Sequence, residues 1–377
     1  MDKIVEPSCR NFSLDVLKSL TVCLIAVFHL FGWSGITDVV PMTLYLGVDL
    51  LFIVTGYTTM MSVCGKCKVS SLDYMKYLWK SRITRLWLPY VIIWAITILF
   101  YLIAYGDNSD LYKYTEFYSY FITFFLLQSI GFTAGGEILG NNPIGIAWPL
   151  AAEFWIGLMV FPLIHRFQKH PVRVMFASGA AAILSLEIIY TLNGLNGAQT
   201  YMGEHMGVYV SVFGLLIPIA VLRCVAGLSL GILVYYLKSI IDESIADKHT
   251  FSVAMTVIEI ITLYVILRTY WKINFSIRNT VVFPFLGAVL VLLLAMEKRK
   301  GLIGIILNLR AIRWFGKLYF GIFLMHPFIV MLVTPWLSLN VPLTIIAFIC
   351  LTLAAAALFH FTAEALGKSL NKKFNKL

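Results

Sequence analysis

Two ionisable side chains stand eleven residues apart in the first long apolar stretch of the chain, residues 14–33. Lys18 and His29 would point within about 20° of each other on an α-helix, because each residue turns the helix by about 100°. At about 1.5 Å per residue they are separated by roughly 16 Å, so that Lys18 reaches one head-group region and His29 lies near or beyond the membrane midplane. An ionisable group at that depth is normally functional. The alternative is a buried histidine that bonds a backbone carbonyl of the next helix.

A carboxylate in the second apolar stretch, residues 42–63, matches His29 in depth. Asp49 and His29 each lie a few residues from the short loop that joins the two stretches. A carboxylate beside a buried histidine raises its basicity and fixes its tautomer, as a general base requires. The alternative is a structural polar pair that holds the hairpin together, since the glycines on either side of Asp49 allow close helix approach.

Two arginines precede the third apolar stretch, residues 86–105. Arg82 and Arg85 are three residues apart and would share nearly one face of a helix at the expected cytoplasmic edge. Guanidinium pairs bind phosphates in bidentate fashion, which suits a polyanionic cofactor. The alternative is a pair that orients the helix and contacts anionic lipid.

Two further ionisable residues lie in later apolar stretches. Glu153 enters the membrane from the outer face, one turn into its helix, and the alternative there is a solvated carboxylate at a helix start within a tryptophan belt. His326 lies about midway through residues 318–337. Pro327 follows it and frees a backbone carbonyl, so a structural hydrogen bond is the alternative for His326.

The composition assigns the whole chain to the membrane. Of its 377 residues, 60% are hydrophobic and only 13% are charged, whereas soluble domains are about 45–50% apolar and about 25% charged. The net charge of +10 is concentrated in short loops, a pattern of membrane topology rather than of nucleic-acid binding. We therefore expect an all-α polytopic helical bundle that forms one integral-membrane domain over residues 1–377, with no soluble domain appended.

The basic loops predict how the helices are oriented, because such loops stay cytoplasmic. We expect both termini and the loops 64–85, 165–173 and 297–317 on the cytoplasmic side. If residues 117–132 crossed the membrane, the basic loop 165–173 would lie outside, so we expect this stretch to be re-entrant or to lie at the outer face. The ten expected crossings are at about 14–33, 42–63, 86–105, 147–164, 174–192, 218–237, 252–270, 280–296, 318–337 and 341–363.

Other catalytic signatures do not account for these residues. Cys64 and Cys67 form a lone C-x-x-C with no second pair and no nearby histidine, so we expect no metal site. The sequence has no H-E-x-x-H, P-loop or dinucleotide motif. Any chemistry must therefore come from the intramembrane ionisable residues.

Taken together, five ordered blocks resemble acyltransferase family 3, whose integral-membrane enzymes modify bacterial surface glycans. The blocks are Lys18 with His29, Gly47-Val48-Asp49 to Gly56-Tyr57, Arg82-x-x-Arg85, Trp148 to Pro162, and Tyr319 to Pro327. The departures are mild, such as Lys18 for the commoner arginine and Thr55 for serine, and none removes an ionisable group.

The resemblance implies transfer of an acyl group, usually acetyl from acetyl-CoA, to a sugar hydroxyl of a lipid-linked or surface glycan such as O-antigen, in the bacterial inner membrane. It implies that the CoA phosphates bind at Arg82 and Arg85. The glycan would then bind at the outer face near Glu153. His29, oriented by Asp49, would act between them as a general base or as a transient acyl acceptor.

Lys18 and His326 are supporting candidates for polarising the thioester or stabilising an oxyanion. A transporter, such as a lipid-linked sugar flippase or a proton-coupled carrier, is the rival from another class, because a proton relay also uses intramembrane His, Asp and Glu. A carrier has no need of an arginine pair. A purely structural membrane subunit would leave the buried ionisable groups unexplained.

Overall fold

The computed structural model describes residues 11–34, 42–105, 117–130, 145–196, 209–212, 215–244, 250–271, 277–337 and 340–374. Ten helical spans in this part of the chain are long and apolar enough to cross a membrane. They coincide with the ten crossings expected from hydropathy, which confirms an all-α polytopic membrane bundle. Residues 106–116, residues 131–144 and both chain ends lie outside the described residues, so the expected cytoplasmic position of the termini falls outside them as well.

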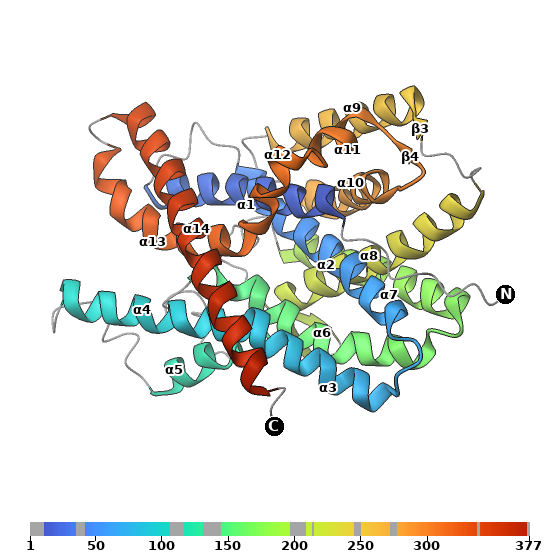
Figure 1. The fold of residues 1–377 in the computed structure, drawn as a ribbon, viewed down its shortest axis with the longest axis horizontal. Coiled ribbons are helices and arrows are strands. Elements are labelled where there is room, and N and C mark those ends of the chain that lie inside the picture. The colour runs from blue at the N-terminus through green and yellow to red at the C-terminus, as the bar shows by residue number, and fades with distance from the viewer. Residues whose placement is uncertain are drawn as a thin grey trace.

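The first half of the chain supplies five of the ten spans. Its elements are α1 (Phe12–Trp33), a 3-10 helix (Met42–Leu46), α2 (Gly47–Gly65), α3 (Ser71–Arg82), a π-helical segment (Ile83–Trp87), α4 (Leu88–Tyr105), α5 (Phe117–Phe124), a 3-10 helix (Gly145–Ala147), α6 (Trp148–Phe167) and α7 (Pro171–Asn196). In Figure 1, α3 and α4 follow one another along the lower side of the molecule, and α6 lies next to α3.

The second half supplies the other five spans and two short strand pairs. Its helices are α8 (Ile219–Ser244), α9 (Val253–Tyr270), α10 (Ile277–Ala295), α11 (Leu302–Leu307), α12 (Arg310–Arg313), a 3-10 helix (Phe315–Lys317), α13 (Tyr319–Val333), a 3-10 helix (Thr334–Trp336) and α14 (Val341–Phe374). Strand β1 (Tyr209–Val212) pairs antiparallel with β2 (Leu215–Pro218), and β3 (Thr250–Phe251) pairs parallel with β4 (Arg299–Lys300). In Figure 1, α14 crosses the bundle obliquely.

The centre of the bundle is built on α2 and α8, whose backbones touch at glycines. A Cβ atom at Gly56 would overlap the carbonyl of Leu228, and one at Gly231 would overlap the carbonyl of Ile53. Small residues let membrane helices approach this closely. The contact fixes the rotation of α2 about its own axis, and therefore the direction in which each of its side chains points.

The third crossing begins earlier than the sequence analysis expected. The stretch 64–85 was expected to be a basic loop, but α3 begins at Ser71 and only about five residues separate it from α2. Ser70 caps the helix by accepting a hydrogen bond from the N–H of Asp73 at 3.1 Å, and it donates one to the Asp73 carboxylate at 2.7 Å. This reciprocal cap is a helix start signal that the density of lysine and arginine concealed.

Residues 117–130, the described part of the stretch 117–132, do not form a crossing helix, as predicted. Helix α5 has only 8 residues, a length of about 12 Å. Aromatic side chains of the neighbouring helices donate hydrogen bonds to the carbonyls at its end: Tyr90 to Thr123 at 2.8 Å, Trp87 to Phe124 at 2.8 Å and Trp155 to Phe125 at 3.1 Å. Irregular backbone at membrane depth needs such partners.

The segment between α10 and α13 packs along the first half of α1. The hydroxyl of Ser13 donates to the carbonyl of Gly304 at 3.0 Å. The hydroxyl of Ser19 donates to the carbonyl of Phe315 at 2.8 Å. Glu259, buried in α9, accepts hydrogen bonds from the N–H groups at the start of α11, including that of Gly304 at 3.2 Å. This segment therefore covers one flank of α1 up to the level of Lys18.

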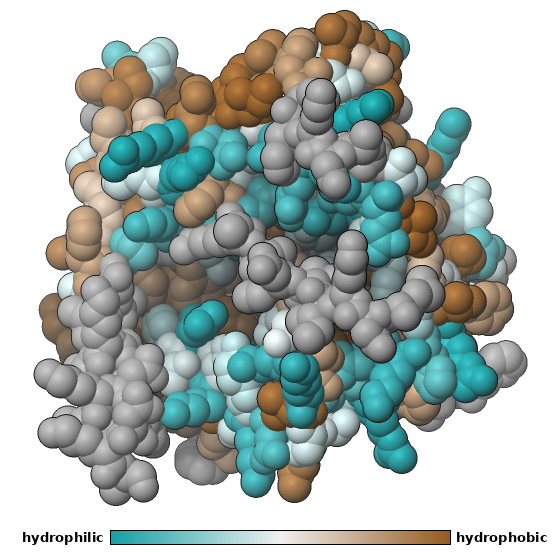
Figure 2. Space-filling model, turned by 45° about the vertical axis from the view of Figure 1, so that its right-hand side comes forward, coloured by the Kyte–Doolittle hydropathy of each residue, from teal (hydrophilic) through white to brown (hydrophobic). Residues whose placement is uncertain are grey.

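The surface divides into apolar and hydrophilic regions. In Figure 2, hydrophilic side chains gather around a hollow on the side of the molecule that carries the end of α2 and the start of α3. Apolar side chains dominate the upper edge of the molecule in the same view. The long apolar side chains exposed on α4, α7, α9 and α14 suit contact with lipid.

Candidate active site

A narrow cavity inside the bundle brings together side chains of α1, α2, α6 and α13. Its polar lining residues are Lys18, Thr55, Glu153 and Tyr319. The remaining lining is apolar: Val22, Leu51, Phe52, Leu86, Pro149, Leu150, Phe320 and Phe323. A few convergent polar groups in a largely apolar cleft are typical of a binding site.

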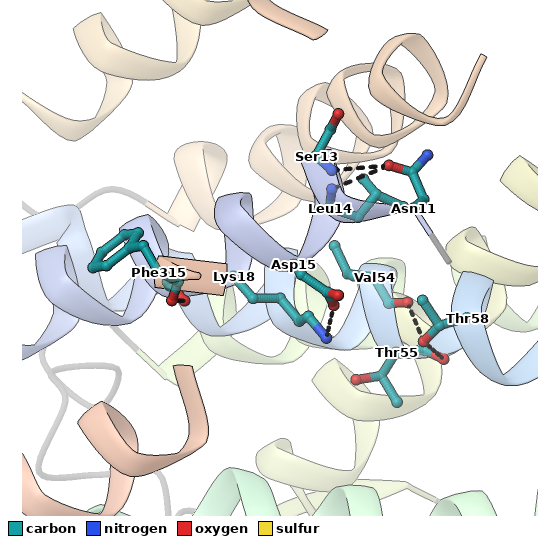
Figure 3. Close-up of polar contacts among 10 residues, drawn as sticks. Asn11, Ser13, Leu14, Asp15, Lys18, Val54, Thr55, Thr58 and Phe315 are labelled. Carbon is teal, nitrogen blue, oxygen red and sulfur yellow. Dashed lines mark hydrogen bonds and ion pairs between the residues drawn. The ribbon is translucent and has the colours of Figure 1, made fainter. Parts of the chain in front are cut away.

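Lys18 reaches this cavity from α1 and is held there by two neighbours. Its Nζ lies 3.0 Å from Oδ1 of Asp15, one turn earlier in the same helix, as Figure 3 shows. The same Nζ lies 4.1 Å from the centre of the Tyr319 ring, a cation–π contact with α13. The ammonium group is thus fixed at the cavity wall rather than snorkelling freely to the head groups.

Glu153 lines the same cavity as Lys18. Its carboxylate interacts with the Thr55 hydroxyl and electrostatically with both Arg82 and Lys18. From the sequence, Glu153 was expected beside the outer loops. The structure instead groups it with the two cations, because α6 runs inward from Trp148 and Glu153 lies more than one turn further along.

Arg82 and Arg85 do not form the side-by-side pair that their spacing predicts. Arg82 is buried and donates a hydrogen bond from Nη1 to the backbone carbonyl of Glu153 at 2.6 Å, whereas Arg85 is exposed. A π-helical segment begins at Ile83, and its wider turn rotates Arg85 away from the face that Arg82 occupies. The guanidinium of Arg82 lies over Gly157, where any Cβ atom would overlap it.

His29 contacts His326 of α13. Nδ1 of His29 lies 3.0 Å from Nε2 of His326, and the two rings are nearly parallel, with an interplanar angle of 14°. His326 is fully buried, midway through α13 as predicted, and its Nδ1 lies 3.0 Å from the carbonyl of Ile322. Because Lys18 contacts Tyr319 and His29 contacts His326, both side chains of α1 face α13, as the helical spacing predicted.

The predicted pair of Asp49 and His29 does not form, because Asp49 binds a different residue. Its carboxylate binds Arg223 of α8 through two hydrogen bonds, and both residues are almost fully buried. The guanidinium also lies 5.3 Å from the ring centres of Tyr45 and Trp148. Asp49 lies in the first turn of α2, and the contact between α2 and α8 turns its side chain toward α8. The signal for Arg223 was available, because it is a charged residue within the apolar stretch 218–237.

The site therefore consists of two polar groups along the α1–α13 interface. The first group contains the cations Lys18 and Arg82 with Glu153. The second is the imidazole pair of His29 and His326, roughly 16 Å further along α1. Cations suit an anionic ligand, and a neutral imidazole suits proton transfer. The arrangement allows one ligand to be held by charge at one end while its reactive group is handled at the other.

The described helices form a polytopic membrane bundle that buries ionisable side chains between its helices. The family model described as an acyltransferase domain matches residues 11–361, nearly the whole chain. The chain therefore belongs to acyltransferase family 3, and the protein is an integral-membrane acyltransferase. No curated protein and no solved structure matches the chain.

Proposed function

We propose that this membrane acyltransferase moves an acetyl group from cytoplasmic acetyl-CoA to a sugar hydroxyl of a lipid-linked or surface glycan such as O-antigen, in the bacterial inner membrane with both chain ends cytoplasmic. The observation that carries the proposal is the position of the cations Lys18 and Arg82 and of the pair His29–His326 along one interface inside the bundle. Family membership favours this reading over a transporter.

The cations supply the donor end of the site. CoA is a polyanion, so its phosphates need guanidinium or ammonium partners. Arg85 is exposed close to Arg82, and Nε of the buried Arg82 has no hydrogen-bond partner among the described residues. The apolar walls of the cavity, including Phe52 and Phe323, suit an uncharged acyl group and exclude water from the thioester.

His29 supplies the proton transfer. As a general base it takes the proton of the sugar hydroxyl while the oxygen attacks the thioester carbonyl carbon. The carbon–sulfur bond then breaks, and the CoA thiolate leaves and is protonated. In the alternative order, His29 first accepts the acyl group and then passes it to the sugar. In either order Lys18, which lines the cavity, is a cation that supports transfer by holding the anionic donor at the other end of the site.

Glycan analysis with a matched pair of histidine variants tests this proposal. Surface glycans from cells carrying the wild-type protein should show one acetyl increment by mass spectrometry, and His29→Ala should abolish it. His360→Ala is the control, because His360 also lies in a membrane helix, on α14, away from the cavity lining. All variants are compared at equal amounts of monodisperse protein in detergent. Unchanged acetylation with His29→Ala, or no acetyl increment with the wild type, would contradict the proposal.

A further inference from the structure

His326 lies between the carbonyl of Ile322 and His29, and its two ring nitrogens contact one of them each. The carbonyl oxygen of Ile322 lies 3.0 Å from Nδ1 of His326. On the other side of the same ring, Nε2 of His326 lies 3.0 Å from Nδ1 of His29. These atoms can carry their protons in only one neutral arrangement.

The arrangement follows from the carbonyl, which can only accept a hydrogen bond. Nδ1 of His326 must therefore carry its proton. A neutral imidazole has one N–H and one lone pair, so Nε2 of His326 is an acceptor. Nδ1 of His29 is then the donor to it, and the lone pair of neutral His29 is on Nε2.

Pro327 strengthens the carbonyl side of this arrangement. A proline has no N–H, so the carbonyl of Phe323, four residues earlier, loses its helical partner. That carbonyl also interacts with His326. The hydrogen bond to Ile322 and this interaction both favour a proton on Nδ1 of His326.

Asp49 is not available for this task. The expected role of Asp49 was to fix the tautomer of His29, but its two oxygens bind Nε and Nη2 of Arg223 at 2.8 and 2.9 Å. His326 is the residue whose ring nitrogen is at hydrogen-bond distance from Nδ1 of His29.

We propose that His326 is a positioning residue that holds His29 in the tautomer with its proton on Nδ1, so that Nε2 is the atom that takes the proton of the acceptor hydroxyl. This inference rests on the proposed function. The O–H bond breaks, its proton goes to Nε2 of His29, and the oxygen bonds the acyl carbon as the carbon–sulfur bond breaks. The leaving thiolate then takes that proton from Nε2. Throughout, Nδ1–H of His29 donates to His326, which stabilises the transient imidazolium.

Two substitutions of His326 separate positioning from packing. In His326→Gln the side-chain oxygen reaches the place of Nε2 and can accept from His29. In His326→Asn the shorter amide reaches only the place of Nδ1, near the helix carbonyls, so the bond to His29 is lost. We expect the Gln variant to retain kcat within about tenfold, and the Asn variant to lose about a hundredfold or more in kcat with little change in KM for acetyl-CoA. Equal kcat values for the two folded variants would overturn the inference.

A spectroscopic measurement tests the tautomer without any turnover. In protein labelled with ¹⁵N-histidine, a ring nitrogen that carries a proton and one that carries a lone pair have well-separated chemical shifts. The signals of His29 are assigned by their loss in His29→Ala, which is practical because the chain has 7 histidines. We expect Nδ1 of His29 to be protonated in the wild type and in His326→Gln, and a shift of the proton toward Nε2 in His326→Asn.

The two measurements distinguish failure of this inference from failure of the proposed function. A wild-type spectrum with the proton of neutral His29 on Nε2 overturns the inference, whatever the protein acetylates. The expected spectrum together with no glycan acetylation overturns the proposed function and leaves the tautomer assignment standing.

Discussion

Asp49 and Arg223 form a buried ion pair that joins α2 to α8, with Nε–Oδ1 and Nη2–Oδ2 distances of 2.8 and 2.9 Å. The pair lies near the start of both helices, on the same interface where Gly56 and Gly231 bring the two backbones into contact. A bidentate guanidinium–carboxylate contact is geometrically specific. It therefore fixes the register of the two helices at the centre of the bundle.

Removing one partner of this pair should destabilise the protein. Arg223→Met leaves the Asp49 carboxylate buried without its counter-charge, which costs about 3–5 kcal/mol. The double variant Asp49→Leu/Arg223→Met removes both charges and should recover most of that stability, since apolar replacements of buried pairs are often neutral. Thermal unfolding in detergent measures both. Normal stability of Asp49→Leu alone, together with lost acyl transfer, would return Asp49 to the catalytic machinery.

Arg82 and Arg85 should contribute differently to use of the donor. Arg85→Ala removes the charge-assisted contact proposed for this exposed arginine, worth about 1.5–3 kcal/mol, so the Kd for acetyl-CoA should rise roughly tenfold to a hundredfold with normal folding. Arg82→Ala should also lower the amount of folded protein, because Arg82 is buried and bonds the carbonyl of Glu153. Calorimetric titration with acetyl-CoA is the measurement. Wild-type affinity in the double variant would show that neither arginine binds the cofactor.

A glycine at position 157 should be needed to leave room for the guanidinium of Arg82. An alanine there would place its Cβ on the guanidinium, so Gly157→Ala should impair donor binding much as Arg82→Ala does. Gly179→Ala is the control, since the nearest atom to a Cβ at Gly179 is Cδ1 of Leu233 at 3.9 Å. In the control the better helix former should add about 0.5–1 kcal/mol of stability. Equal donor affinity in the two variants would mean that Arg82 moves aside without consequence.

The sequence alone predicted the ten membrane-crossing stretches and one helix face, the one that Lys18 and His29 share on α1. Apolar length and basic loops determine where a chain enters and leaves the membrane, and both can be read one segment at a time. The shared face of Lys18 and His29 depends only on helical geometry within α1, and both residues do contact α13. Local rules therefore located the ten apolar spans and the shared face of α1, although they missed the start of α3 at Ser71.

The partners across helices could not be derived in this way. Asp49 and His29 match in depth, but which neighbour Asp49 meets depends on the rotation of α2, set by its glycine contacts with α8. The separation of Arg82 from Arg85 depends on a π-helical turn, which the residue types do not announce. The position of a residue along its helix can be counted from the sequence. The direction in which its side chain points depends on helix packing, which only the folded bundle determines.

Lys18 should be required for acyl transfer because of its charge, and the neighbouring carboxylate allows that role to be separated from stability. Lys18→Met removes the cation from the cavity and leaves Asp15, 3.0 Å away, buried beside an apolar chain. Both activity and folding should suffer. The double variant Asp15→Asn/Lys18→Met also removes the charge of Asp15, so the amount of folded protein should recover. Acyl transfer should stay at least about tenfold below that of the wild type, because a charge-assisted contact worth about 1.5–3 kcal/mol is missing. Lys18→Arg keeps the charge and should retain most activity. The measurement is acetyl transfer from radiolabelled acetyl-CoA per amount of monodisperse protein. Wild-type activity in the double variant would show that Lys18 is only a structural partner of Asp15.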